Sequence, residues 1–346
     1  MNRPNNNDNN IHNHEPPANE DILPNLLPWD ANDSSDDDSS VEEEIPTPEE
    51  VTVEYTYPQD FQGRRWQDVV GRDAVTGRHH FFRLLLDPSC KEIAPEKFRN
   101  CSRLIELVVP KNSVLTHIRH DAFYDCNNLQ RITNGFPETP LILEDYAFGW
   151  CRSLHGRLVI PPKVRRLGEQ CFLWCSALTS MVFEASTSAT VGTSPHIAVV
   201  LGSYCFARCT ELQFLRLPST LITIPTECFL GCVNLTDILI PKSVQNIGRS
   251  SFKECRTLRS MKLSNTVEEV RQRAFEHCTS LERISIGGSS SQIRFGPNIF
   301  QGCSSLSIIK MYPWLYPKLF EAMRYDPSFI YKFFHQYHHQ ILGETD

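Results

Sequence analysis

The sequence lacks any run of about 18 consecutive apolar residues, so we expect no helix that crosses a membrane. It does not open on a positively charged stretch followed by apolar residues, the pattern of a secretory signal, and we therefore expect an intracellular location, cytoplasmic or nuclear. It also lacks a phosphate-binding loop, a nucleophile elbow, a two-histidine zinc-protease helix and a dinucleotide-binding glycine pattern. No enzyme class is indicated, and we expect neither catalysis nor a cofactor.

One motif recurs instead: phenylalanine, then cysteine three residues later, then leucine three residues after that. It occurs nine times, with successive phenylalanines 25, 25, 24, 34, 23, 23, 23 and 25 residues apart. A fixed period in this range predicts a solenoid whose coils stack on one another. The predicted structural core contains the nine pairs Phe98 and Cys101, Phe123 and Cys126, Phe148 and Cys151, Phe172 and Cys175, Phe206 and Cys209, Phe229 and Cys232, Phe252 and Cys255, Phe275 and Cys278, and Phe300 and Cys303.

The rest of each repeat also follows a pattern. A second apolar residue stands five positions before each phenylalanine, and an alternating run such as 235–240 follows each leucine. Alternation of this kind predicts a short strand, which a proline or small residue ends. A coil of about 23 residues cannot bury its own apolar side, so we expect it to be stable only beside its neighbours.

The repeat resembles the BspA-like subclass of the leucine-rich repeat family. The matching residues are an A-F-x-x-C-x-x-L core, as at Ala122-Phe123, Ala147-Phe148 and Ala274-Phe275, followed by L-x-x-I-x-I-P. The resemblance covers about residues 84–311. It implies a right-handed superhelix with a parallel β-sheet on its concave face and short helical turns on its convex side. It also implies interaction with other molecules as the usual role.

Charge divides the chain into an acidic tail and a basic body. Residues 1–54 contain 15 Asp and Glu against Arg3 alone, which gives −14. The whole chain carries −7, so residues 55–346 carry +7. We expect residues 1–50 to form a disordered acidic tail, because they cannot bury enough apolar surface to become ordered.

The solenoid needs a cap at each end. We expect residues 51–83 to form an N-terminal cap, residues 84–311 to form nine coils, and residues 312–346 to form a C-terminal helical cap. In the last segment, Asp326-Pro327 has the pattern of a helix start. The 34-residue spacing marks an insertion at about 184–195, which we expect to be a surface loop.

The thirteen cysteines raise three alternatives: core thiols, disulfides and metal ligands. Nine occupy one repeat position, and Cys171, Cys205 and Cys228 stand just before a phenylalanine, where Ala or Ser stands elsewhere. That substitution pattern indicates small, buried, reduced thiols, although stacked coils could bring pairs within disulfide distance. Cys-x-x-x-Cys pairs, and the histidines at 335, 338 and 339, have spacings that permit a metal ion, but we expect none.

Side chains alternate along a strand, so the fifth and seventh residues after each cysteine should point outward, shifted by one after Cys151. These positions hold six cations against the acids Glu106 and Asp237. Such a row attracts anionic partners, although an ordinary mixed polar face is the alternative. The candidate binding residues are Arg131, Arg157, Phe214, Arg216, Asp237, Leu239, Lys262, Arg283 and Lys310.

The sequence thus predicts a non-catalytic module that binds an acidic protein or peptide on its concave strand face. One alternative is a regulatory scaffold that the acidic tail latches by folding over the same face. Two further alternatives are a nucleic-acid binder and a thiol- or metal-dependent enzyme. A body charge of only +7, with no aromatic ladder among the cations, argues against nucleic acid.

Overall fold

A computed structural model describes residues 44–333, apart from residues 75, 185–197, 288–292, 325 and 331. The chain divides into two units, Met1–Glu44 and Ile45–Asp346, and the second contains the solenoid. Most of the predicted acidic tail, the expected loop at 184–195 and the histidines at 335, 338 and 339 therefore lie outside the described residues.

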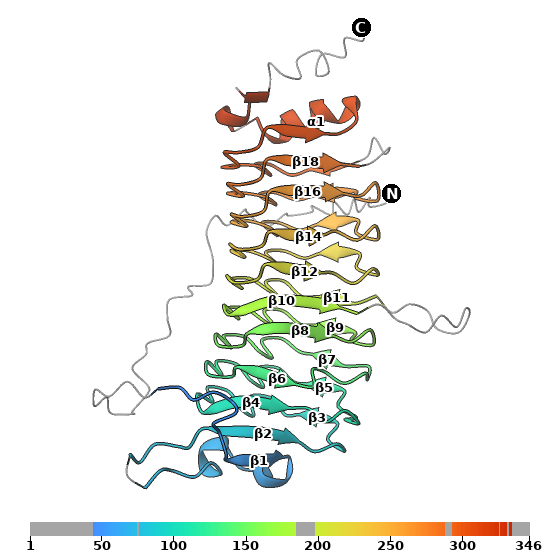
Figure 1. Ribbon diagram of the computed structural model, residues 1–346. Helices are drawn as coiled ribbons and strands as arrows, with labels where there is room; N and C mark the ends of the chain where they lie inside the picture. The colour runs from blue at the N-terminus through green and yellow to red at the C-terminus, as the bar shows by residue number, and fades with distance from the viewer. Residues whose placement is uncertain are drawn as a thin grey trace, which may run out of the picture. The chain divides into compact units, whose positions relative to one another are not determined.

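Parallel strands, one from each successive coil, form one side of the solenoid (Figure 1). They are hydrogen-bonded in three groups, ordered β1-β2-β4-β6, β8-β10-β12-β14 and β16-β18-β20. Their outward surface is called the front face below. The strands are β1 Glu54–Tyr57, β2 Phe82–Leu86, β4 Leu104–Val108, β6 Arg131–Thr133, β8 Gly156–Ile160, β10 Leu178–Phe183, β12 Phe214–Arg216, β14 Asp237–Leu239, β16 Ser260–Leu263, β18 Arg283–Ile286 and β20 Ile308–Lys310.

A second set of parallel strands, each two residues long, forms another side of the solenoid. In most of them the second residue is the buried apolar residue that stands five positions before the phenylalanine. These strands are β3 Glu92–Ile93, β5 His117–Ile118, β7 Ile142–Leu143, β9 Arg166–Leu167, β11 Val200–Leu201, β13 Thr223–Ile224, β15 Asn246–Ile247, β17 Glu269–Val270 and β19 Arg294–Phe295. The predicted solenoid with parallel sheets is confirmed.

Tight turns carry the phenylalanine and cysteine of each coil. The residues two before and two after each phenylalanine have left-handed φ angles, for example 58° at Tyr146 and 63° at Trp150. Backbone groups in these turns bond to the next coil: the Phe123 N–H donates to the Ala147 carbonyl at 2.9 Å. The ladder between coils satisfies polar groups that would otherwise be buried without a partner.

The nine phenylalanine rings form a column inside the solenoid, and all nine are buried. Rings of successive coils stack with centroids 5.0–5.9 Å apart. Eight of the nine repeat cysteines are buried beside the column, while Cys303 in the last coil is only partly buried. The coils on both sides of each phenylalanine therefore shield its ring from solvent.

Aromatic side chains also cover the two ends of the column. At the N-terminal end, β1 pairs with β2, and the Phe61 ring at the end of η2 (Gln59–Phe61) lies 5.1 Å from the Phe98 ring. The 3-10 helix η3 (Trp66–Asp68) follows η2. At the C-terminal end, η4 (Pro313–Leu315) and α1 (Tyr316–Ala322) precede Phe329, whose ring stacks 6.2 Å from that of Phe300. Asp326 Oδ1 accepts the Phe329 N–H at 3.1 Å, the bond of a helix N-cap.

Candidate functional site

The strand register aligns the outward residues within β8-β10-β12-β14 and within β16-β18-β20. The same repeat positions continue from one group to the next, which gives two rows across the strands. A bulge between Leu178 and Ser180 brings Arg157 opposite Ser180, so the one-residue shift after Cys151 is present in the structure. The first row contains Arg157, Ser180, Phe214, Asp237, Ser260, Arg283 and Ile308. The second row contains Val159, Val182, Arg216, Leu239, Lys262, Ser285 and Lys310.

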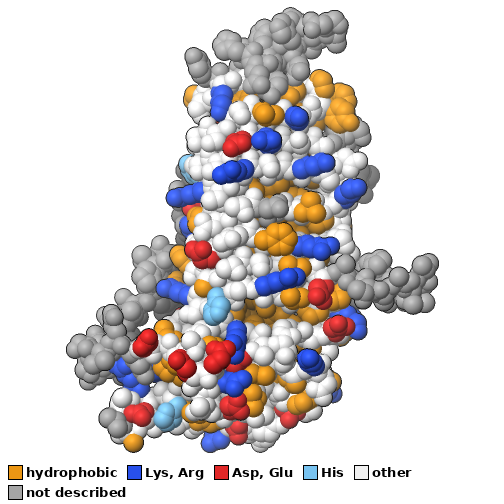
Figure 2. All heavy atoms as spheres, viewed as in Figure 1, with side chains coloured by type: hydrophobic (Ala, Val, Ile, Leu, Met, Phe, Trp, Pro, Cys, Tyr) orange, Lys and Arg blue, Asp and Glu red, His pale blue; other side chains and the backbone are white. Residues whose placement is uncertain are grey.

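Most cations in these rows are exposed and have no carboxylate partner. Among the described residues, Arg157, Arg216, Lys262 and Lys310 form no ion pair. Arg283 lies 3.5 Å from Glu282, but both side chains are exposed, and such pairs contribute little. Figure 2 shows blue and orange side chains over this face, with most acidic groups toward its N-terminal end. The side chain of Asp237 lies outside the described part of the chain.

Apolar side chains are exposed among these cations. Leu239 is 74% exposed, and Phe214 and Ile308 are 44% and 41% exposed. Just beyond the second row, the rings of Tyr312 and Trp314 stack at 4.6 Å and are also exposed. A shallow groove of about 310 Å³ adjoins them, lined by Lys262, Leu263, Ser285, Ile286, Gly287, Lys310, Met311 and Tyr312.

The N-terminal end of the front face differs from this. Glu106, which we expected among the outward residues, is fully buried. Its carboxylate lies 2.6 Å from Arg83 Nε and 2.9 Å from Arg131 Nε, and it also accepts the Thr133 hydroxyl. Burial tends to raise the pKa of Glu106, but these hydrogen bonds outweigh burial and lower it. Among the described residues, Arg131 is therefore already paired with a buried carboxylate, unlike Arg157, Arg216, Lys262 and Lys310.

Residues 45–50, at the end of the predicted tail, also contact this part of the face. Glu49 forms an ion pair with Arg131, and Gln130 Nε2 donates to the Pro46 carbonyl at 2.9 Å. Pro48, which lies between Pro46 and Glu49, is buried. A short acidic segment thus already occupies the front face at β6.

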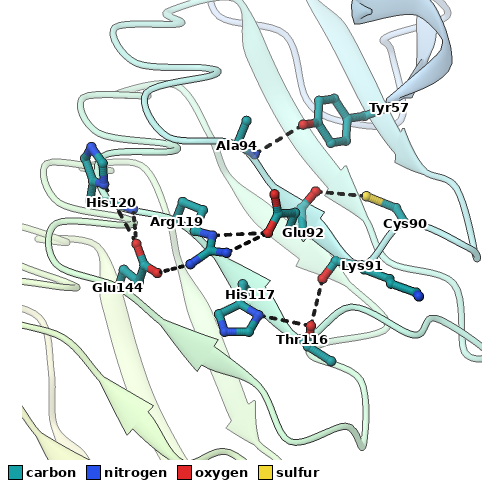
Figure 3. A network of polar contacts seen from close by, with 10 residues as sticks. All are labelled: Tyr57, Cys90, Lys91, Glu92, Ala94, Thr116, His117, Arg119, His120 and Glu144. Carbon is teal, nitrogen blue, oxygen red and sulfur yellow. Dashed lines mark hydrogen bonds and ion pairs between the residues drawn. The ribbon is translucent and has the colours of Figure 1, made fainter.

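The two-residue strands carry charges of a different arrangement, shown in Figure 3. Arg119 lies between two carboxylates, 2.7 Å from Glu92 and 2.8 Å from Glu144. Burial tends to raise the pKa of Glu144, but the Arg119 side chain and the His120 N–H lower it overall. Arg119 thus pairs with acids of the two neighbouring coils, so these charges are already engaged with one another.

The repeat thiols serve the core. From the second coil onward, each Sγ donates to the carbonyl of the preceding coil's phenylalanine at 3.0–3.3 Å, as from Cys255 to Phe229. Burial raises the pKa of Cys255 well above its ordinary value, so its thiolate is scarce. Within the residues that the structure covers, no three His, Cys, Asp or Glu are grouped to hold a metal ion.

The model of the BspA type leucine-rich repeat region matches residues 91–194 and 193–307, more than half of the chain. A leucine-rich repeat protein of Bacteroides ovatus is 28% identical in sequence, with a TM-score of 0.57. The match covers 74% of this chain and 60% of that protein, so the chain spans less than two thirds of its length. A leucine-rich repeat protein of Treponema pallidum is 25% identical, covering 55% of this chain and 86% of that protein, with a TM-score of 0.43.

No curated protein sequence matches the chain significantly. In the described segments, no helix has the length and apolar character needed to span a membrane.

Proposed function

The chain belongs to the BspA type of leucine-rich repeat proteins, and on this basis we propose that it is a non-catalytic interaction module for an acidic protein or peptide. The proposed binding surface is the front face from β8 to β20. The observation that carries the proposal is the set of exposed cations without carboxylate partners, Arg157, Arg216, Lys262 and Lys310. A carboxylate that meets them breaks no existing ion pair.

Charge and apolar surface have separate roles in this proposal. Unpaired cations on one face steer an acidic partner toward it and speed encounter, an effect that salt screens. Exposed ion pairs contribute little affinity individually. The remaining binding free energy comes from burial of Phe214, Leu239 and Ile308, at about 25 cal/mol for each Å² of apolar surface removed from water.

A selection from a random peptide library tests the proposal. Peptides that bind the full chain should be enriched in Asp and Glu, and their affinity should fall as salt is added. The double variant Arg216→Ser, Lys262→Ser should bind them about two- to thirtyfold more weakly, since two exposed ion pairs are lost. The matched control Lys163→Ser, Lys242→Ser removes two exposed lysines outside the rows and should bind normally.

Two outcomes would contradict the proposal. One is equal loss of affinity in the row variant and in the control variant. The other is a selection without enrichment in acidic residues while arbitrary DNA binds with steep salt dependence, which would favour nucleic acid.

A second candidate function is regulation by the acidic tail. It is supported by the ion pair of Glu49 with Arg131 and by the bond from Gln130 to Pro46, which bring an acidic segment to the same face. If the tail competes with the partner, Asp36→Asn, Asp37→Asn, Asp38→Asn in the full chain should raise the affinity for an acidic peptide several-fold. Unchanged affinity at low salt would reject this competition.

We also propose that the protein works in a reducing compartment inside the cell. All thirteen cysteines are unpaired, and eight repeat thiols donate hydrogen bonds that a disulfide would remove. Alkylation of the denatured protein, purified from its source without reductant, should label all thirteen. Detection of cysteine-linked peptides by mass spectrometry would contradict this location.

A further inference from the structure

The cations of the second row recur on every second strand. Arg216 lies on β12, Lys262 on β16 and Lys310 on β20, with Leu239 and Ser285 on the strands between them. Neighbouring strands lie about 4.7–4.9 Å apart, so successive cations start about 9.4–9.8 Å apart. β14 and β16 belong to different hydrogen-bonded groups, but the Phe229 and Phe252 rings of their coils stack at 5.2 Å, within the 5.0–5.9 Å range of the column.

This spacing can be compared with the repeats of a peptide that runs along the row. A polyproline II helix has three residues per turn and rises about 3.1 Å per residue, so every third side chain returns to one face after about 9.3 Å. A β-strand returns a side chain to the same face after about 6.6–6.8 Å, and an α-helix after about 5.4 Å. Only the polyproline II repeat meets all three cations with one acid per turn.

The end of the row offers a second feature of the same kind. The exposed rings of Tyr312 and Trp314 stack at 4.6 Å beside Lys310, next to the groove whose lining includes Leu263 and Met311. Tyr312 is the aromatic residue in the lining of this groove. Proline-rich segments in the polyproline II conformation dock on surfaces with exposed aromatic rings, because the preformed helix loses little entropy on binding.

We propose that the front face binds a proline-containing acidic segment in the polyproline II conformation, with an acid at every third residue. The segment runs across the strands from Arg216 to the Tyr312 and Trp314 pair. This inference rests on the proposed function and specifies the conformation and spacing of the partner.

Two synthetic 12-residue peptides of identical composition test the spacing. One contains four Glu-Pro-Pro repeats, and the other contains the same four Glu and eight Pro with the acids at alternate positions. Both have the same charge and similar backbone preferences. The full chain should bind the every-third peptide about fivefold more tightly at low salt, since the mismatch removes at least one exposed ion pair.

Variants locate the preference on the row. Lys262→Ala should make the two peptides nearly equal, because the middle cation is lost, whereas Lys242→Ala should keep the preference. Trp314→Ala should weaken the binding of both peptides. The circular dichroism and melting temperature of this variant should match those of the unchanged protein, because the Trp314 side chain is exposed.

The outcomes separate this inference from the proposed function. Equal, salt-dependent affinity for both peptides in the unchanged protein would overturn the spacing and leave an acidic partner in place. A preference that survives Lys262→Ala would place the peptide elsewhere and also overturn the inference. Binding of neither peptide, together with a library selection that yields no acidic sequences, would overturn both.

Discussion

At the scale of single residues, the repeat cysteine has a role that a small apolar residue could not fill. The Phe229 carbonyl accepts the Cys232 N–H at 3.2 Å within its own coil and the Cys255 Sγ at 3.3 Å from the next coil. The thiol therefore packs as a small apolar group and also joins two coils through a weak hydrogen bond. The sequence pattern indicated only the first role, because spacing shows burial and does not show a donor's partner.

The phenylalanine column should dominate stability. Phe252 is fully buried, and its ring stacks between those of Phe229 and Phe275 at 5.2 and 5.3 Å. Phe252→Ala should lower the free energy of unfolding by about 3–5 kcal/mol, measured by chemical denaturation. Phe214→Ala, on the exposed front face, is the control and should cost less than about 1 kcal/mol. A similar small cost at Phe252 would mean that the column is not the core.

Glu106 should make stability depend on pH. Its pKa is lowered in the folded state, so its contribution is fully present above its unfolded pKa of about 4.3 and is lost as pH falls through the folded value. The variant Glu106→Gln should be less stable than the unchanged protein at neutral pH, because Arg83 and Arg131 lose their buried partner. The difference should shrink as the pH falls below about 4. A difference that is constant between acid and neutral pH would contradict the burial of an ionised carboxylate.

At the scale of elements, the two ends of the solenoid should protect different coils. Phe61 packs on Phe98 at the N-terminal end, and Phe329 packs on Phe300 at the C-terminal end. Phe61→Ala should speed hydrogen exchange in β2 and β4 with little effect in β18 and β20, since each coil contacts only its neighbours. Phe329→Ala should speed exchange in β18 and β20 with little effect in β2 and β4. Equal acceleration along the whole chain in both variants would show instead that the coils unfold as one unit.

The strands show which structural features sequence reasoning could supply. Alternation after each leucine predicted β12 and β14 with Leu215 and Ile238 inward, and these side chains are buried. The pairing of β1 with β2 was not predicted, because neither strand follows a copy of the phenylalanine and cysteine motif. For the same reason the sequence did not indicate Arg83, whose approach from the neighbouring strand keeps Glu106 buried and paired.

At the scale of the whole solenoid, neighbouring coils place charges differently on different sides. Arg119 is paired with acids from the coils before and after its own, whereas Arg216 and Lys262 on the front face have no such partner among the described residues. The repeat fixes which positions face outward, but the residues at those positions vary freely from coil to coil. We therefore expect binding specificity to reside in the rows across the strands.

Hydrogen exchange of the full chain, with and without a saturating acidic polyproline peptide, tests the central claim most directly. The account predicts slower exchange in the front-face strands β12, β14, β16, β18 and β20 and in the turns that follow them, with no change along β3, β5, β7 and β9. Protection confined to those two-residue strands or to the turns that carry the phenylalanines would contradict a front-face binding surface.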